Sequence, residues 1–269
     1  MIRDITLGQY YPVDSVLHRM DPRTKLFGTL VFIVSLFFAN SIACYVAATL
    51  FLVTAIRMSK VPFSFMVRGL KAILFLLLIS VSFNLFLTPG TPVVQFGIFK
   101  ITQEGIRTAG FMALRLIYLV IGSSVMTLTT TPNELTDGLE KSLGFLNKVG
   151  VPVHEVSMMM SIALRFIPIL VEETDKIMNA QKARGAQLDN GKMTERIKAL
   201  VPVLVPLFIS AFRRADELAM AMECRCYRGG DGRTRLKVLR CEKQDYIDLV
   251  VCIACFAVIL ASRLVFPNF

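Results

Sequence analysis

The side chains best suited to specific chemistry in this chain are two arginines, each near the C-terminal end of a long helical stretch. The guanidinium group is a planar fork of donors that pairs with a carboxylate through two parallel hydrogen bonds. An arginine at a helix end can therefore bind carboxylates of a partner protein. The alternative is that both helices are ordinary amphipathic helices with solvated arginines. The two tripeptides are Ala183-Arg184-Gly185 and Cys224-Arg225-Cys226.

The two helical stretches that carry these arginines begin apolar and become charged toward their C-terminal ends. Residues 156–171 contain one charge, Arg165, and residues 199–212 contain none. A helix of about 33 residues would be roughly 50 Å long, which is too long for a small soluble core. The pattern therefore predicts two arms that connect a membrane to a partner.

Other chemistries have weak support in the sequence. Residues 185–192 come nearest to a phosphate-binding loop, but their spacing is one residue too long and they follow a helix. Cys224 and Cys226 with the distant Cys241 form a weak zinc pattern, because no histidine is near them. We found no paired carboxylates and no Ser/His/Asp set. We therefore predict no enzyme activity, no metal site and no cofactor.

The composition indicates a polytopic membrane protein. Hydrophobic residues make up 54% of the 269 residues, whereas soluble domains contain roughly 45–50%. The formal charge of +10 is typical of a protein whose basic loops set its topology and contact anionic lipid. Because the predicted cytosolic segment mixes both signs of charge, we expect no nucleic-acid partner.

Five segments are predicted to cross the bilayer, which takes about 20 residues each. Residues 26–56 contain no charge and are interrupted by Asn40-Ser41, which predicts two spans joined by a tight turn. Arg115 lies inside a span, and we expect it to face a neighbouring helix or the membrane interface. The other three predicted spans are residues 72–87, 105–130 and 246–264.

The distribution of basic residues predicts the orientation in the membrane. Short loops rich in lysine and arginine stay in the cytosol. The N-terminal segment and residues 57–71 are basic, so we expect a cytosolic N-terminus and an external C-terminus. Residues 1–130 would form the N-terminal membrane domain, residues 131–245 a cytosolic domain, and residues 246–269 the last span.

Three amphipathic helices are predicted in the cytosolic domain. The first begins at residues 131–134 (TPNE), which combine a capping Thr, a Pro at the first helical position and a Glu, and it should end at Gly150. The others start near Val153 and Thr194. The apolar parts of these two helices are short for spans, and export of residues 172–198, which carry six Lys and Arg residues, would oppose the positive-inside bias. The expected fold is therefore all-α, with five spans and a platform of three coupling helices.

Seven short stretches of the chain, taken together and in order, carry a family resemblance. They are residues 8–10 (GQY), 17–25 (LHRMDPRTK), 130–132 (TTP), 161–168 (SIALRFIP), 181–185 (QKARG), 212–217 (FRRADE) and 227–230 (YRGG). With them the chain resembles the transmembrane T component of energy-coupling factor (ECF) transporters over essentially its whole length. The ordered set is specific, although each stretch alone is not.

The resemblance implies that the two arginines dock this chain onto two ATP-binding-cassette ATPases. In the family, an Ala-Arg-Gly motif at the end of each long coupling helix enters a groove of one ATPase. Arg184 lies in a full motif, whereas cysteines flank Arg225. Cysteine adopts the left-handed conformation of a helix end less readily than glycine. We therefore expect the second helix to continue toward Gly229-Gly230.

The resemblance also implies that a substrate-binding S component rests on the apolar parts of the two long helices. Closure of the ATPases on ATP would draw the arms together, tilt the platform and reorient the S component. The partners would be two ATPases, which bind the ATP, the S component and the bilayer. The expected interface residues are Met158, Met159, Ile162, Phe166, Val203, Leu207 and Phe208.

The expected function is therefore energy coupling in an importer of vitamins or other micronutrients, in the plasma membrane of a prokaryote. Residues 8–10 and the lack of a dedicated partner within the chain favour a T component shared by several S components. A subunit dedicated to cobalt, nickel or biotin is the alternative. A self-sufficient carrier would need a polar lining, which the predicted spans lack.

Overall fold

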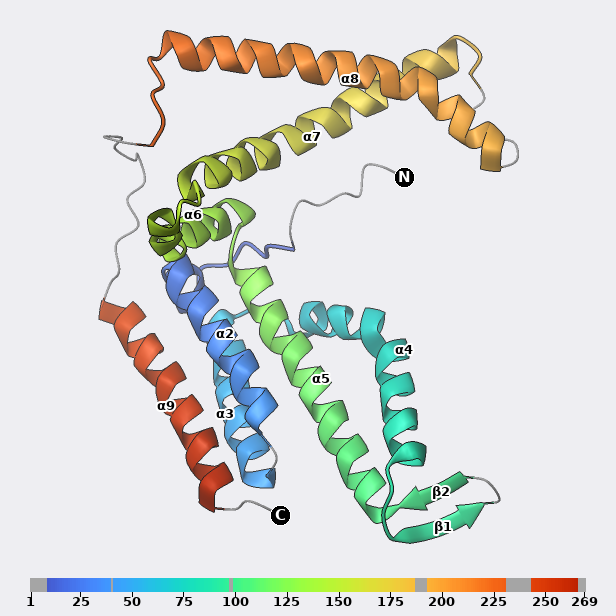
Figure 1. The fold of residues 1–269 in the computed structure, drawn as a ribbon, viewed down its shortest axis with the longest axis vertical. Coiled ribbons are helices and arrows are strands. Elements are labelled where there is room, and N and C mark those ends of the chain that lie inside the picture. The colour runs from blue at the N-terminus through green and yellow to red at the C-terminus, as the bar shows by residue number, and fades with distance from the viewer. Residues whose placement is uncertain (1–8, 40, 97–98, 187–192, 231–242, 266–269) are drawn as a thin grey trace. The chain divides into compact units, whose positions relative to one another are not determined.

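The computed structural model divides into two compact units, each of which is mainly helical (Figure 1). The bundle unit comprises Gly8–Gly138 and Val238–Phe269. The described residues of the arm unit lie within Leu139–Lys237. The residues that the structure describes are 9–39, 41–96, 99–186, 193–230 and 243–265.

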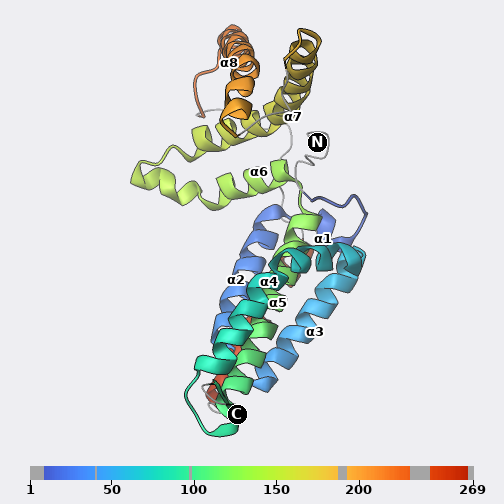
Figure 2. The ribbon, with the colours of Figure 1, turned by 90° about the vertical axis from the view of Figure 1, so that its right-hand side faces the viewer.

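The described residues of the bundle unit include five long helices, the single turn α1 and a short β-hairpin. Within it, α2 packs against α5 and α9, α3 packs against α9, and α4 packs against α5 (Figures 1 and 2). α2 ends at Phe38 and α3 begins at Ile42, so residues 26–56 form two helices as predicted, while Asn40 itself lies outside the described residues. The helices are α1 (Val16–Arg19), α2 (Pro22–Phe38), α3 (Ile42–Ser59), α4 (Phe63–Leu87), α5 (Gln103–Thr129) and α9 (Lys243–Val265).

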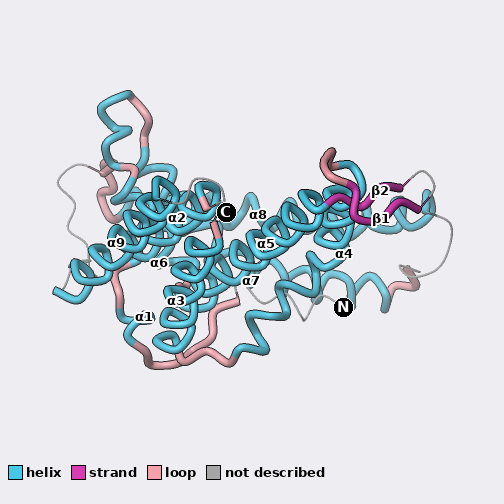
Figure 3. Tube along the Cα trace, turned by 90° about the horizontal axis from the view of Figure 1, so that it is seen from below, coloured by secondary structure: helices cyan, strands magenta, loops and turns pink. Residues whose placement is uncertain are grey.

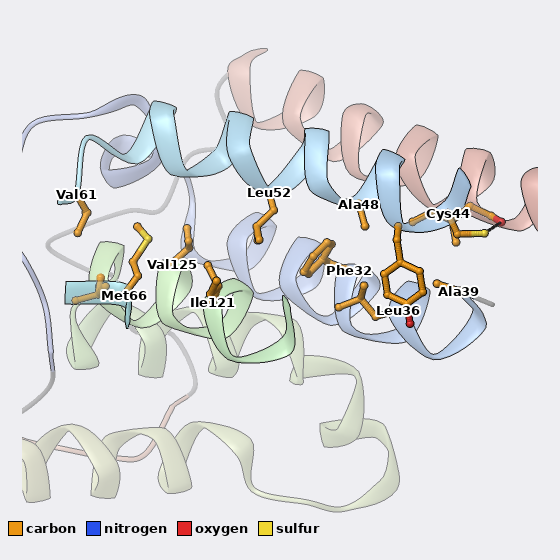
Figure 4. Packing of buried hydrophobic residues seen from close by; sticks show 13 residues of the cluster. Phe32, Leu36, Ala39, Cys44, Ala48, Leu52, Val61, Met66, Ile121 and Val125 are labelled. Atoms are coloured by element: carbon orange, nitrogen blue, oxygen red, sulfur yellow. Dashed lines mark hydrogen bonds between the residues drawn. The ribbon is translucent and has the colours of Figure 1, made fainter. Parts of the chain in front are cut away.

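The core of the bundle unit lies where α2, α3 and α5 meet (Figure 4). Leu36 and Ala48 are fully buried there, and Phe32 stacks on Phe51 with ring centroids 5.3 Å apart. Gly122 of α5 faces Phe32, because a Cβ at this position would lie 2.7 Å from the ring. The close crossing of α2 and α5 therefore requires a residue without a side chain.

The first turn of α2 and its N-cap residue join helix ends that are far apart in the sequence. Asp21 caps α2, and its backbone N–H donates a 2.8 Å hydrogen bond to Asp245 Oδ1 at the start of α9. Lys25 Nζ donates to the Thr129 carbonyl at the end of α5, at 2.9 Å. These contacts give residues 17–25 a structural role.

Arg115 also joins two helices of the bundle. Its guanidinium donates a 3.0 Å hydrogen bond to the carbonyl of Ala39, which caps the C-terminal end of α2, and lies 5.9 Å from the centroid of the Phe37 ring. The free carbonyls of a helix end are satisfied by such a donor. The prediction that Arg115 faces a neighbouring helix is confirmed.

Two features of the bundle unit differ from the predicted all-α fold with plain loops. β1 (Pro92–Phe96) and β2 (Phe99–Thr102) form an antiparallel hairpin between α4 and α5 (Figure 3). The short β-branched and aromatic runs on both sides of Gly97 favour strands. In addition, α4 bends by 60° between Phe63–Lys71 and Ile73–Leu87, so part of the predicted basic loop is helical.

The elements that follow α5 in the sequence lead from the bundle unit into the arm unit. The capping box at the start of α6 is confirmed, because Glu134 N–H donates to Thr131 Oγ1 and Thr131 N–H donates to Glu134 Oε2. The helix ends earlier than predicted, and only a 3₁₀ turn continues to Gly150, whose φ is +86°. The elements are α6 (Pro132–Ser142), η1 (Gly144–Val149), α7 (Val153–Ala183) and α8 (Met193–Cys224).

Length and composition select a different set of spans from the one predicted. Among the described helices, α3, α5 and α7 are long and apolar enough to cross a bilayer, and the two halves of α4 count as a fourth span if they act as one. α7 qualifies because it continues past the apolar residues 156–171 to a length of 31 residues. α2, with 17 residues, is about 26 Å long. The prediction of five spans beside cytosolic α7 and α8 therefore stays a prediction.

Candidate functional site

The two long helices of the arm unit cross each other and run antiparallel. Arg214 of α8 forms a 3.2 Å ion pair with Glu173 of α7, and Gln181, later in α7, donates to the carbonyl of Pro202, earlier in α8. The C-terminal ends of α7 and α8 lie on opposite sides of the crossing (Figure 1). The two candidate arginines are therefore held apart on one helical support.

The end of α7 has the hydrogen bonds of a Schellman motif. Gly185 N–H donates to the Lys182 carbonyl and Ala186 N–H donates to the Gln181 carbonyl, both at 3.0 Å. Gly185 has φ +89°, in the left-handed region that glycine adopts without steric cost. Arg184 is thus the residue directly before a sharp turn of the chain.

The end of α8 has the same backbone geometry without a glycine. Cys226 N–H donates to the Glu223 carbonyl at 2.8 Å, and Tyr227 N–H donates to the Met222 carbonyl at 3.1 Å. Cys226 takes the left-handed position, with φ +55°. Arg225 therefore occupies the position that Arg184 has in α7.

The expectation that α8 continues toward Gly229-Gly230 was wrong, because the helix ends at Cys224. The tertiary structure provides the reason. A Cβ at Gly230 would lie 2.6 Å from Cδ2 of His154, in the first turn of α7. The chain must turn back at Cys226 to reach this contact.

All six residues of the two tripeptides are exposed. Neither guanidinium forms a hydrogen bond or an ion pair with any residue in the described part of the chain. Exposed, unpaired arginines at two equivalent helix ends are available to a partner protein. The six residues are Ala183, Arg184, Gly185, Cys224, Arg225 and Cys226.

The residues predicted for the S-component interface lie in different environments. Met159 and Phe208 are exposed, at 58% and 61% of their surface. Val203 is 3% exposed and lies inside the arm unit, so its side chain is not available to a partner. The four that are half-buried are Met158, Ile162, Phe166 and Leu207.

Sequence reasoning missed most of the exposed apolar stripe of α8. Its members occur as adjacent residues that repeat every four positions, which places them on one face of the helix. Residues 199–212 are apolar at nearly every position, so no periodicity in the sequence distinguishes this face from the face packed on α7. The exposed stripe consists of Leu200, Val201, Leu204, Val205, Phe208, Ile209 and Phe212.

The chemistry of the described residues centres on the two arginines and the apolar stripe. Within the described ranges, His, Cys, Asp and Glu residues form no group of three that could hold a metal ion. Cys224 and Cys226 are free, exposed thiols. Gly8, Cys241 and residues 187–192 lie outside the described residues.

Comparisons with known proteins agree with the resemblance. The chain matches the family described as "Cobalt transport protein" (CbiQ) over residues 14–236. It is 52% identical to the energy-coupling factor transporter transmembrane protein EcfT of Clostridium kluyveri over 266 residues, 98% of each chain. The protein of the same name from Ruminiclostridium cellulolyticum is 52% identical over 247 residues, 92% of each chain. That of Bacillus subtilis is 45% identical over 264 residues, 98% of this chain and 100% of the relative.

These relatives are named as transporter components and not as enzymes. The predicted family resemblance is confirmed by their identity over nearly the whole chain and by the family match. The apolar helices of the bundle unit agree with a membrane protein. The chain therefore belongs to the CbiQ family, among the transmembrane T components of energy-coupling factor transporters.

Proposed function

We propose that this chain couples two ATP-binding-cassette ATPases to a substrate-binding S component, as part of a vitamin or micronutrient importer in a bacterial plasma membrane. One observation carries the proposal: α7 and α8 end in the same backbone geometry, and each end presents an exposed arginine. Two equivalent ends suit two related ATPases.

The arginines suit this role because each offers a rigid fork of donors at the tip of a helix. An exposed ion pair contributes at most about 1 kcal/mol. Loss of one partner from a buried, hydrogen-bonded pair costs about 2–5 kcal/mol. We therefore expect Arg184 and Arg225 to enter grooves that contain carboxylates, where water is excluded and the contact withstands the motion of the ATPases.

The exposed apolar stripe of α8 is the proposed seat of the S component. Phe208 and Phe212 expose 61% and 69% of their surfaces, and patches of this kind mark protein or membrane contacts. On α7, Met159 and Met160 are exposed as well. Methionine-rich surfaces adapt to several partners, which agrees with a T component shared by several S components.

In the proposed topology, α2, α3, α4, α5 and α9 cross the membrane and both arms lie in the cytosol. If α7 crossed instead, the six Lys and Arg residues within 172–198 would reach the outer side, against the positive-inside bias. The N-terminus is cytosolic in this arrangement.

The proposal is tested by affinity purification of the full chain co-expressed with the two ATPases and an S component. Arg184→Glu and Arg225→Glu are each expected to weaken one ATPase contact by about 30-fold or more, from the 2–5 kcal/mol quoted for such pairs. The double variant should lose both ATPases and retain the S component. Retention of both ATPases by the double variant would refute arginine docking.

Matched controls separate these contacts from general effects of charge. Lys176→Glu and Arg213→Glu reverse exposed charges on the same two helices and should leave both ATPases bound. Phe208→Glu combined with Ile209→Glu should release the S component while the ATPases remain. Release of the ATPases by the control variants would show that net charge, and not the helix ends, holds them.

A further inference from the structure

The bundle unit contains a cavity of about 450 Å³ between α2, α3, α5 and α9, a volume within the usual range of small-molecule sites. Its walls come from the N-terminal parts of α2 and α9 and the C-terminal parts of α3 and α5. The cavity therefore lies toward one end of the bundle, the end that faces the cytosol in the topology proposed above.

The lining of the cavity changes from polar to apolar along the helices. Lys25 and Asp248 line it near the helix ends, whereas Phe32, Ala47 and Val258 line its inner part. At a rise of 1.5 Å per residue, the inner residues lie roughly 10–17 Å further along their helices. A ligand that matches this gradient has a polar head and a long apolar tail.

The two charged residues of the lining differ in their partners. Lys25 is 6% exposed, and its ammonium donates to the carbonyls of Thr129 at 2.9 Å and His18 at 3.4 Å. The carboxylate of Asp248 forms no hydrogen bond or ion pair with the described residues. An unpaired carboxylate beside an apolar cavity is unfavourable, so the head of the ligand should carry a cation.

A second charge is expected in the head group because two basic residues lie close in the sequence to Met58, which lines the cavity. Arg57 and Lys60 are exposed on either side of the turn that ends α3, next to the lining residue Met58. Within the described ranges neither side chain pairs with a carboxylate. Basic side chains at a membrane surface attract phosphate groups of lipids.

We propose that this cavity binds one phosphatidylethanolamine molecule. Its primary ammonium pairs with Asp248, its phosphate lies near Arg57 and Lys60, and one acyl chain fills the inner part between Phe32 and Val258. The lipid would bridge α3 and α9, which both line the cavity. This site is independent of the arginines that are proposed to dock the ATPases.

The test uses the full chain purified in mild detergent and incubated with equal amounts of phosphatidylethanolamine, phosphatidylglycerol and phosphatidylcholine. Native mass spectrometry then counts the lipids bound to each chain. We expect about one phosphatidylethanolamine per chain, retained about fivefold or more over either other lipid, which corresponds to about 1 kcal/mol.

Two variants probe the head and the tail separately. Asp248→Asn should remove the preference for phosphatidylethanolamine, whereas Asp216→Asn, an exposed carboxylate on α8, should retain it. Ala47→Phe should reduce retention of every phospholipid by about fivefold, whereas Ala43→Phe, one turn earlier on α3 and outside the cavity, should not. Ala55→Phe is a second variant of the lining if Ala47→Phe does not fold.

Equal retention of the three lipids by the wild type would overturn the assignment of the head group. Unchanged lipid retention in both folded lining variants would overturn the assignment of the lipid to this cavity. Binding of detergent in place of all three lipids would also refute the proposal. The thermal unfolding midpoint of each variant establishes that it is folded before its lipids are counted.

Discussion

Arg225 keeps the backbone setting of Arg184 although cysteine replaces glycine after it. The left-handed conformation costs roughly 1–2 kcal/mol for a residue with a Cβ, and Cys226 adopts it with φ +55°. The contact between Gly230 and His154 and the two hydrogen bonds of the motif offset this cost. The position of the arginine therefore depends on the fold as well as on the local sequence.

At the scale of single residues, we predict that substitutions at the equivalent positions Cys226 and Gly185 have opposite effects on stability. Cys226→Gly should raise the stability of the arm unit by about 0.5–1 kcal/mol, because relief of backbone strain exceeds the added entropy of the unfolded chain. Gly185→Ala should lower it by about 1 kcal/mol, since φ is +89° there. The midpoint of thermal unfolding in detergent measures both.

Cys224→Ala is the control for this pair, because Cys224 is the last residue of α8 and has ordinary helical geometry. It should change the stability by less than about 0.5 kcal/mol. A lower midpoint for Cys226→Gly than for the wild type would contradict the account of strain at Cys226.

At the scale of elements, α6 is the helix whose sequence runs from the bundle unit into the arm unit. Its start is anchored by the capping box, and Gly138 lies against Pro22 at the start of α2, where a Cβ would be 2.9 Å from the Pro22 Cβ. A separation this short leaves no room for a side chain. The small residue therefore sets how closely α6 approaches α2.

We predict that Gly138→Ala destabilises the protein by about 1–2 kcal/mol through overpacking against Pro22. In an uncrowded helix, Gly→Ala stabilises by about 1 kcal/mol. The overpacking against Pro22 must therefore outweigh this gain in helix propensity. Gly144→Ala is the matched control, because nothing lies within 4 Å of a Cβ at Gly144. Equal midpoints of thermal unfolding for the two variants would show that the crossing tolerates a methyl group.

At the scale of the whole molecule, the topology determines which side of the membrane the arms occupy. α7 is long and apolar enough to span, yet the proposed function requires both of its ends in the cytosol. Length and hydropathy do not show whether α7 crosses the membrane or lies in the cytosol. The side of the membrane on which its C-terminal end lies does show it.

We predict the outcome of cysteine labelling with a membrane-impermeant maleimide in intact cells, in a chain whose six cysteines are replaced by alanine. Thr91→Cys, in the exposed segment between α4 and α5, should react from outside. Asp14→Cys and Lys182→Cys should react only after permeabilisation, because basic flanks stay inside. Reaction of Lys182→Cys in intact cells would show that α7 crosses the membrane.

Much of the architecture was predictable because its causes are local in the chain. The uncharged residues 26–56 with their polar break became α2 and α3, and the capping box at Thr131 and Glu134 formed as predicted. The starts of α7 and α8 lie within one residue of the predicted positions. Apolar runs, caps and breaks act through neighbouring residues, so the sequence alone was sufficient for them.

The remaining features depend on contacts between distant residues, and only the tertiary structure decided them. The end of α8 follows from Gly230 against His154, and the face of α8 that buries Val203 and exposes Phe208 follows from its packing on α7. Asp21 meets Asp245 across 224 positions of sequence. The free energies of such contacts arise only when the chain is folded, so an apolar run or a helix end does not reveal its partner from its own residues.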